Sequence, residues 1–190
     1  KALHVFDRND PPNQSNGLFN GGYNALAHLV YLGEQGGIGL AYSHGYSPGG
    51  EVNLTGGTGS LLAISPFGDN IATSNHIIAT QGFYQFSEQL QIHAWGGYTW
   101  ANAENSNLSN LDNGTGETDS LFVNQGDNAQ SWYGAVGLSF PDLGGEGHLP
   151  GILVGVPPHV NSSDIRVEDD NTYHSEYLLC YSTVCSALFK

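Results

Sequence analysis

The stretch that decides the fold runs from residue 37 to residue 50 and reads GIGLAYSHGYSPGG. Its large side chains all share one parity: Ile38, Leu40, Tyr42, His44 and Tyr46. Only Gly, Ala or Ser stands at the intervening positions 37 to 45. Because side chains alternate between the faces of a strand, the pattern predicts a strand that is bulky on one face and nearly bare on the other. A soluble sandwich fills its inward face with bulky apolar groups and makes its outward face polar, whereas the second face here carries almost no side chain. We therefore interpret the bulky face as facing hydrocarbon and the small face as lining a lumen.

The charge balance excludes one class of partner. The 190 residues contain 18 Asp and Glu against 4 Lys and Arg, for a formal net charge of −14. A polyanion such as nucleic acid is repelled by such a chain, so no nucleic-acid partner is expected. No apolar run reaches the roughly 20 residues of a membrane helix, whereas a membrane β-barrel needs strands of only about 9–11 residues.

Strand-like segments recur along the chain, and helix-period segments are hard to find. We predict strands at 23–32, 37–46, 76–86, 90–100, 131–140, 151–158 and 173–181. Short connections join the first, second and third pairs, and long loops rich in Gly, Asn, Ser and Asp run through 47–75, 101–130 and 159–172. Short turns at one end and long loops at the other are typical of an outer-membrane barrel, so we expect the turns at 33–36 and 87–89 to share one end.

Charged and aromatic residues follow the same plan. Glu176 is the only one of the 18 carboxylates that lies within a predicted strand. Strands that cross a bilayer exclude charge, whereas soluble edge strands normally carry Lys or Glu. Aromatic residues next to the long loops are predicted to form an interfacial girdle: Tyr42, Tyr46, Tyr98, Trp100 and Trp132.

Four segments carry a family resemblance: NGLFNGGYNALAHLVY (16–31), SLLAISPFG (60–68) followed by ATSN, SFPDLGGEGHLPGILVGVPPHV (139–160) and YHSEYLLCY (173–181). They resemble the C-terminal barrel half of cyanobacterial outer-membrane porins of the OprB-type, carbohydrate-selective family, over most of residues 15 to 181. The block from 139 to 160 is the most specific part.

The resemblance implies an all-β fold, an antiparallel transmembrane β-barrel of roughly sixteen strands in the bacterial outer membrane. It implies passive diffusion of small hydrophilic solutes such as sugars and inorganic ions, contact with outer-membrane lipid, and a homo-oligomer, a trimer, of the full-length parent. Residues 1–190 are interpreted as a single partial barrel domain of about seven strands, with a divergent tail at 182–190. Because seven strands cannot close a wide barrel, we interpret the chain as a fragment or truncated product.

Two groups of polar residues are candidate functional residues. The expected pore-lining set is Gln81, Gln85, Gln91, His93, Thr99, Tyr133, Ser139 and Glu176. A loop-charge set either raises the cation concentration at the pore mouth or only keeps the loop solvated: Glu104, Asp112, Glu117, Asp119 and Asp127. SLLAISPFG is too apolar for a solvated loop, so we expect it to pack into the lumen or against a neighbouring subunit.

The residues also allow functions and sites other than those of a porin. No nucleophile elbow or phosphate-binding loop is present, so no enzyme, cofactor or metal is expected. His174 and Glu176, with His93, His28 or His76, would make a metal site, but a water-bonded polar pair is favoured. A disulfide between Cys180 and Cys185 would require a turn between them. The main alternative function is a soluble β-sandwich that binds carbohydrate, and a third is a surface fragment without transport.

Overall fold

The computed structural model describes residues 2–7, 21–50, 52–112, 118–165, 177–181 and 184–188. Eleven strands and one short helix make up this part of the chain, with α1 at Leu61–Ile64. The strands are β1 (Ala2–Asp7), β2 (Tyr23–Leu32), β3 (Gly36–Ser47), β4 (Thr73–Ser87), β5 (Leu90–Ala103), β6 (Asn107–Asp112), β7 (Thr118–Val123), β8 (Asn128–Ser139), β9 (Gly151–Ser163), β10 (Tyr177–Tyr181) and β11 (Val184–Leu188). Within the described residues, no helix is long and apolar enough to cross a membrane. The described part of the chain is all-β with almost no helix, as the sequence predicts.

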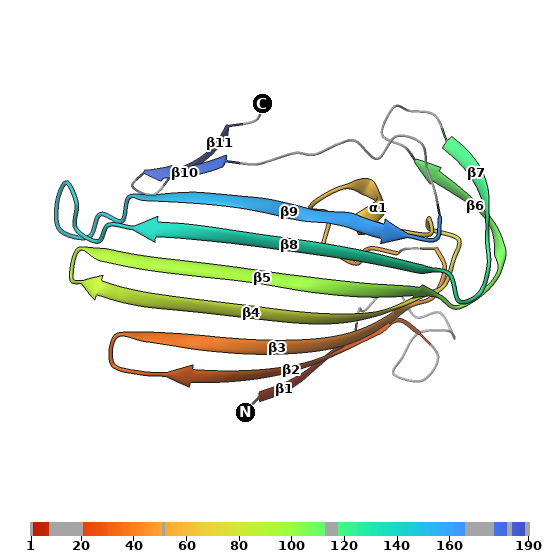
Figure 1. Cartoon of the computed structure of the whole chain (residues 1–190), viewed down its shortest axis with the longest axis horizontal. Coiled ribbons are helices and arrows are strands. Elements are labelled where there is room, and N and C mark those ends of the chain that lie inside the picture. Colours follow the sequence, from red (N-terminus) through yellow and green to blue (C-terminus); the bar gives the residue numbers. More distant parts are fainter. Residues whose placement is uncertain are drawn as a thin grey trace.

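Nine strands form one antiparallel sheet in the order β1-β2-β3-β4-β5-β8-β9-β10-β11. Strands that follow one another in the sheet also follow one another in the chain, except where the separate β6-β7 hairpin lies between β5 and β8. Figure 1 shows the β2-β3, β4-β5 and β8-β9 turns at one end of the sheet and the long loops at the other. This arrangement confirms the expected placement of the turns at 33–36 and 87–89.

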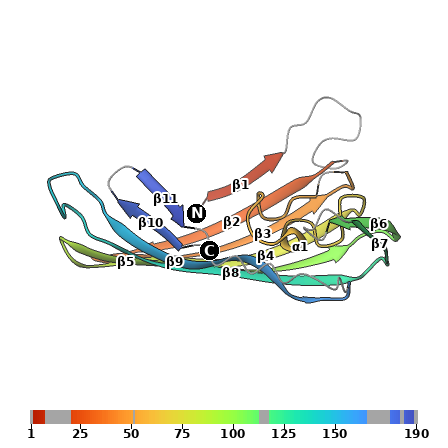
Figure 2. The same cartoon turned by 90° about the horizontal axis from the view of Figure 1, so that it is seen from above.

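The sheet is curved rather than flat. Figure 2 shows β1 and the β10-β11 hairpin, the two edges of the sheet, bending toward the same side, which also carries α1. We call this side the concave face and the opposite side the convex face. Within the described residues the sheet has two open edges and forms no closed barrel.

The structure has four more strands than the predicted count of about seven. The predicted strands do not include β1, β6, β7 and β11. Asp7, Asp112 and Asp119, which were expected outside the strands, therefore lie within them. The tail at 182–190 contains β11, and the predicted strand at 173–181 begins at Tyr177, with 173–176 outside the described residues. Backbone register pairs Cys180 with Cys185 across the turn that a bridge would need.

The loop between β3 and β4 folds onto the concave face. Its apolar side chains join a buried cluster with alanines of β5 and β8, the last residue of β7 and a residue after β9: Leu62, Phe67, Ile71, Ala101, Ala103, Val123, Ala129 and Ile165. The predicted packing of SLLAISPFG is thus confirmed, and its partner is the concave side of the same sheet. Ser60 caps α1 by accepting a hydrogen bond from the Ala63 N–H at 3.2 Å.

A pair of prolines in β9 provides the anchor for this loop. Pro157 and Pro158 lack N–H groups, and the pairing of β8 with β9 becomes irregular beside them. The Ser60 N–H donates to the Pro158 carbonyl at 2.9 Å, outside the regular ladder. Gly59 has φ +94, and a Cβ at this position would run into Pro158, so glycine is required where the loop meets the strand.

Candidate functional site

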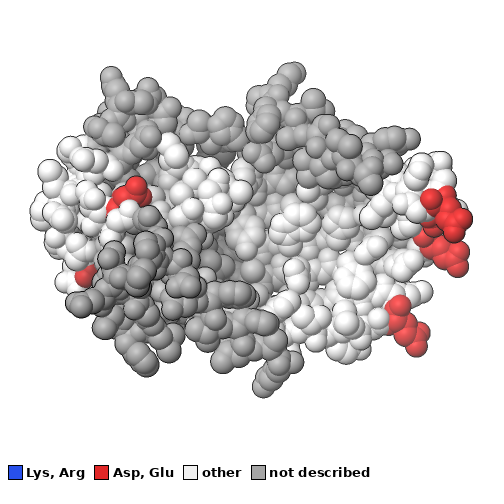
Figure 3. All heavy atoms as spheres, turned by 180° about the vertical axis from the view of Figure 1, so that it is seen from behind, with Lys and Arg blue, Asp and Glu red and all other residues white. Residues whose placement is uncertain are grey.

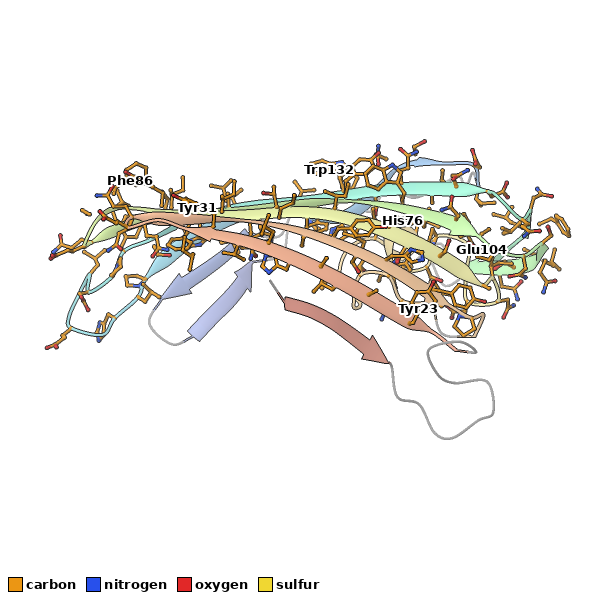
Figure 4. The ribbon with its side chains drawn as sticks, turned by 90° about the horizontal axis from the view of Figure 1, so that it is seen from below. Tyr23, Tyr31, His76, Phe86, Glu104 and Trp132 are labelled. Carbon is orange, nitrogen blue, oxygen red and sulfur yellow. The ribbon has the colours of Figure 1, made fainter. Side chains whose placement is uncertain are left out.

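The register divides the side chains of the sheet into two faces. In an antiparallel pair, residues directly opposite each other point to the same face. One such row runs across the sheet through Leu29, Leu40, Thr80, Gly96, Gly134 and Val156. Figure 4 shows the labelled Tyr31, Phe86 and Trp132 on the convex side, away from β1 and β10.

The convex face is apolar and exposed. Ile38 is 60% exposed, Leu40 54% and Val136 50%, although all three lie within long strands. Exposed neighbours on the same face are Leu29, Ile78, Leu138, Ile152 and Val154. Among the described residues, no element covers these side chains. Soluble monomers rarely expose a contiguous apolar surface of more than a few hundred Å², so a face of this composition is unusual for a soluble monomer.

Aromatic rings border this apolar band near the long loops. We call this border the long-loop belt: Tyr42, His44, His76, Tyr98, Trp100 and Trp132. The His44 and His76 rings stack with centroids 4.5 Å apart, and the Tyr42 hydroxyl is hydrogen-bonded to His76 Nδ1 at 2.8 Å. Tyr98 packs on Trp100 at 4.7 Å. The rings thus form a continuous polar-tipped band at one height of the sheet.

A second border lies near the short turns. This short-turn belt consists of Tyr31, Tyr84 and Phe86, with Tyr84 and Phe86 edge to face at 4.9 Å. His76 of the long-loop belt and Phe86 lie ten positions apart on β4. Ten residues at about 3.3 Å cover about 33 Å along the strand, and a tilt of about 45° reduces this to about 23 Å. The apolar band of an outer-membrane barrel is about 25 Å tall, close to this separation.

The six long strands β2, β3, β4, β5, β8 and β9 contain no Asp, Glu, Lys or Arg. Figure 3 shows the concave side, with its acidic side chains at the two ends of the molecule and no Lys or Arg among the described residues. The strands carry histidine as their only titratable group besides tyrosine. Charge is thus excluded from the height of the apolar band on both faces.

The concave face is smoother than its residue types suggest. A Cβ at Gly97 would lie 2.5 Å from the Tyr133 ring, and one at Gly137 would run into the His93 ring. Gly39 lies in the same way beneath His28. These rings therefore lie flat over glycines of the neighbouring strand, as in the aromatic rescue of strand glycines. On β3 this space is provided by the Gly, Ala and Ser residues at the odd positions from 37 to 45.

The expected pore-lining residues share one face where they are described. Register places Gln81, Gln85, Gln91, His93, Thr99, Tyr133 and Ser139 on the concave side. His93 Nδ1 and Ser139 Oγ are hydrogen-bonded at 3.3 Å, and Thr99 is buried at 5% exposure. Glu176 lies outside the described residues. The structure thus brings seven of the set together, and their contact with a solute stays a prediction.

The loop-charge residues are gathered beyond the long-loop end of the strands. Glu104 accepts a hydrogen bond from the Ser74 hydroxyl, and Asp127 accepts one from the Asn124 N–H at 2.8 Å. Asp112 and Asp119 lie on the facing strands of the β6-β7 hairpin, and Glu117 lies outside the described residues. The loop predicted at 101–130 is therefore largely a hairpin, which its polar sequence conceals.

Trp95 is the residue that the predicted set omits. It lies on the concave face as the cross-strand partner of Gln81, is 40% exposed, and stacks with His93 at 6.2 Å between centroids. It lines three cavities, and two of them, of about 500 Å³ and about 230 Å³, are also lined by Tyr133. The sequence already indicated this position, because Trp95 is at an odd position of the strand, as Gln91 and His93 are, and therefore shares their face.

The histidines considered for a metal site are not brought together. Register places His28 and His93 on the concave face and His76 on the convex face. His174 and Glu176 lie outside the described residues. In the described ranges, no group of three His, Cys, Asp or Glu residues is positioned to hold a metal ion.

The chain has relatives in cyanobacteria. It is 51% identical over 167 residues to the uncharacterized protein sll0772 of Synechocystis sp. strain PCC 6803, a match that covers 87% of this chain and 30% of the relative. It is 26% identical over 160 residues to the uncharacterized protein alr4550 of Nostoc sp. strain PCC 7120, covering 80% of this chain and 24% of the relative. The chain thus spans less than a third of the length of these curated relatives. No model of a known protein family and no solved structure matches it.

Proposed function

We propose that this chain forms part of the wall of a porin in the bacterial outer membrane, of the OprB-type, carbohydrate-selective kind. The pore allows passive diffusion of small hydrophilic solutes, sugars and inorganic ions, with a preference for cations. The observation that carries the proposal is the convex face, where exposed Leu, Ile and Val side chains of uncharged strands lie between two aromatic belts.

Lipid is the environment that fits this face. Water penalises exposed apolar surface at about 25 cal/mol per Å², whereas hydrocarbon does not. Tyr, Trp and His carry polar tips on apolar rings, and such rings lie at the level of lipid headgroups. The calculated separation of the belts, about 23 Å, fits the thickness of an outer-membrane apolar band.

The concave face fits the lumen of a pore. It carries amides, hydroxyls and imidazoles, together with exposed Leu32 and Phe83 near the short turns. Its rings lie flat against glycines such as Gly97 and Gly137, which keeps the wall thin. A closed barrel has no free strand edge, because lipid cannot hydrogen-bond to backbone groups. In the proposed pore, the edges β1 and β11 therefore pair with further strands.

The cation preference rests on the distribution of charge. Acidic side chains such as Glu104 and Asp127 lie at the ends of the strands, and the formal net charge is −14. Fixed charges act over about 8–10 Å at physiological salt, comparable to the radius of a pore mouth. Carboxylates in that position concentrate cations and slow anions.

The proposal is tested by adding the purified full-length parent, in which further strands close the sheet, to planar bilayers in KCl and recording the current. Stepwise conductance is expected, and a detergent-only addition is the control. The soluble-sandwich alternative makes the opposite prediction: without detergent the chain stays monomeric and melts in one cooperative transition. That behaviour, without conductance, would rule out the porin.

A further inference from the structure

Trp95 differs from the other two tryptophans of the chain in its position. Trp100 and Trp132 belong to the long-loop belt on the convex face, whereas Trp95 lies on the concave face near the middle of β5. An indole that is 40% exposed in a wet position costs free energy unless something covers it. Its ring is held beside the His93 ring, at 6.2 Å and 13° between planes.

One cavity lies between Trp95 and the loop that folds onto the concave face. Its volume is about 500 Å³, and its walls include Leu54, Thr55 and Thr58 of the loop together with Thr99, Tyr133 and Pro157 of the sheet. Ligand pockets in proteins typically measure about 300–1,000 Å³. The cavity therefore has room for a small ring compound, with hydroxyl groups on the loop side.

A second cavity lies on the other side of the same two aromatic residues. It measures about 230 Å³ and is lined by His28 and Gln81 as well as Trp95 and Tyr133. His28 Nε2 and Gln81 Nε2 lie 3.3 Å apart within hydrogen-bonding distance. Trp95 and Tyr133 thus stand between two adjacent recesses, one bordered by hydroxyls and the other by an amide and an imidazole.

The lining of both cavities selects one class of ligand. It contains no Asp, Glu, Lys or Arg, so nothing in it compensates the charge of a bound ion. An exposed indole face offers a flat apolar surface, and Thr, Gln, His and Tyr side chains offer hydrogen bonds around it. A neutral ring that is apolar on its faces and hydroxylated at its edge satisfies both features.

We propose that Trp95 and Tyr133 form a binding site for a neutral pyranose sugar on the pore wall, with the ring stacked on the Trp95 indole. The site rests on the proposed porin function, because that function makes the concave face the solute path. Hydroxyls of the sugar bond to Thr55 and Thr58 on one side and to Gln81 and His28 on the other. Sugars are thus held by this wall site, whereas inorganic ions respond to the carboxylates at the ends.

The test is sugar-induced block of the ion current through the full-length parent in planar bilayers. Glucose and maltose are the probes, and mannitol, an open-chain polyol without a ring, is the control solute. Trp95→Ala is compared with Trp132→Phe, a matched change on the convex face. We expect the half-blocking maltose concentration to rise at least about tenfold in W95A and to stay unchanged in W132F.

Equal block of the wild-type chain and W95A, or equal block by glucose and mannitol, overturns the sugar site while the porin stands. A second measurement separates the two proposals. In the Trp100→Phe, Trp132→Phe double variant, Trp95 is the only tryptophan, so maltose binding in detergent is read from its fluorescence. A saturable change without any channel conductance supports the site and rejects the pore, and no change rejects the site.

Discussion

Leu40→Lys tests whether lipid covers the convex face. Leu40 is 54% exposed and lies between the two belts, two residues from Tyr42 of the long-loop belt and four from Gly36, the partner of Tyr84 in the short-turn belt. Two residues cover about 7 Å along a strand and four about 13 Å, so position 40 lies inside the apolar band. A charge introduced here lies within the height of this band.

The expected cost follows from this depth. Lys at the midplane of a β-barrel costs about 2–4 kcal/mol, whereas substitutions at an exposed position in water change stability by about 0.5 kcal/mol or less. We expect Leu40→Lys to lower the free energy of unfolding by about 2–4 kcal/mol. The assay is the urea unfolding equilibrium of the full chain in dilauroylphosphatidylcholine vesicles, followed by tryptophan fluorescence.

Gln81→Lys is the matched control, because Gln81 pairs with Gly39, the neighbour of Leu40, and lies at the same height on the concave face. It is expected to cost less than about 0.5 kcal/mol. Phe86→Lys, in the short-turn belt, is expected to cost about 0–1 kcal/mol. If Leu40→Lys costs no more than Gln81→Lys, the convex face is not in lipid and the reasoning fails.

Other perturbations test the remaining features. Gly137→Ala is expected to destabilise the sheet by about 1–3 kcal/mol, because its Cβ displaces the His93 ring, whereas Gly134→Ala on the convex face of β8 makes only ordinary van der Waals contacts and is tolerated; equal urea midpoints contradict this. Brominated lipid is expected to quench Trp132 and spare Trp95, which single-tryptophan variants measure, and quenching of Trp95 alone reverses the faces. Neutralising the loop-charge set is expected to lower the cation-to-anion permeability ratio at low salt and to leave it nearly unchanged at about 1 M, and an unchanged reversal potential at low salt would place these loops outside the permeation path. The replaced residues are Glu104, Asp112, Glu117, Asp119 and Asp127.

The long strands were predictable because their signal is local. The predicted strand at 23–32 has the bounds of β2, and the alternation at 37–46 gave the two faces of β3. The β6-β7 hairpin was missed because NLSNLD and TDSLFV have the composition of a loop and alternate weakly. Its pairing comes from the two segments together, which no single window of sequence contains.

The site was less predictable than the strands, because it depends on register and on a loop. Parity alone put Gln91 and His93 on one face with Trp95, but it could not bring Thr55 and Thr58 to the same place. That contact is made by the loop, which the Ser60 N–H ties to the Pro158 carbonyl. Pro157 and Pro158 were predicted to end the strand at 151–158. In the structure β9 continues past them, and the loop is attached to β9 at this point.

The Gly, Ala and Ser residues at the odd positions from 37 to 45 therefore have a more specific role than leaving space for solvent. Gly39 receives the His28 side chain and Gly97 the Tyr133 ring, so each glycine lies beneath a large side chain of a neighbouring strand. Because those side chains lie along the wall, the concave face projects little at most positions. Trp95 is 40% exposed, and Leu32 and Phe83 on the same face also project, at 68% and 41% exposure. In the proposed pore, solute preference is set by a few projecting groups and by the inward loop, so we expect exchange of Trp95 to change selectivity without changing the barrel.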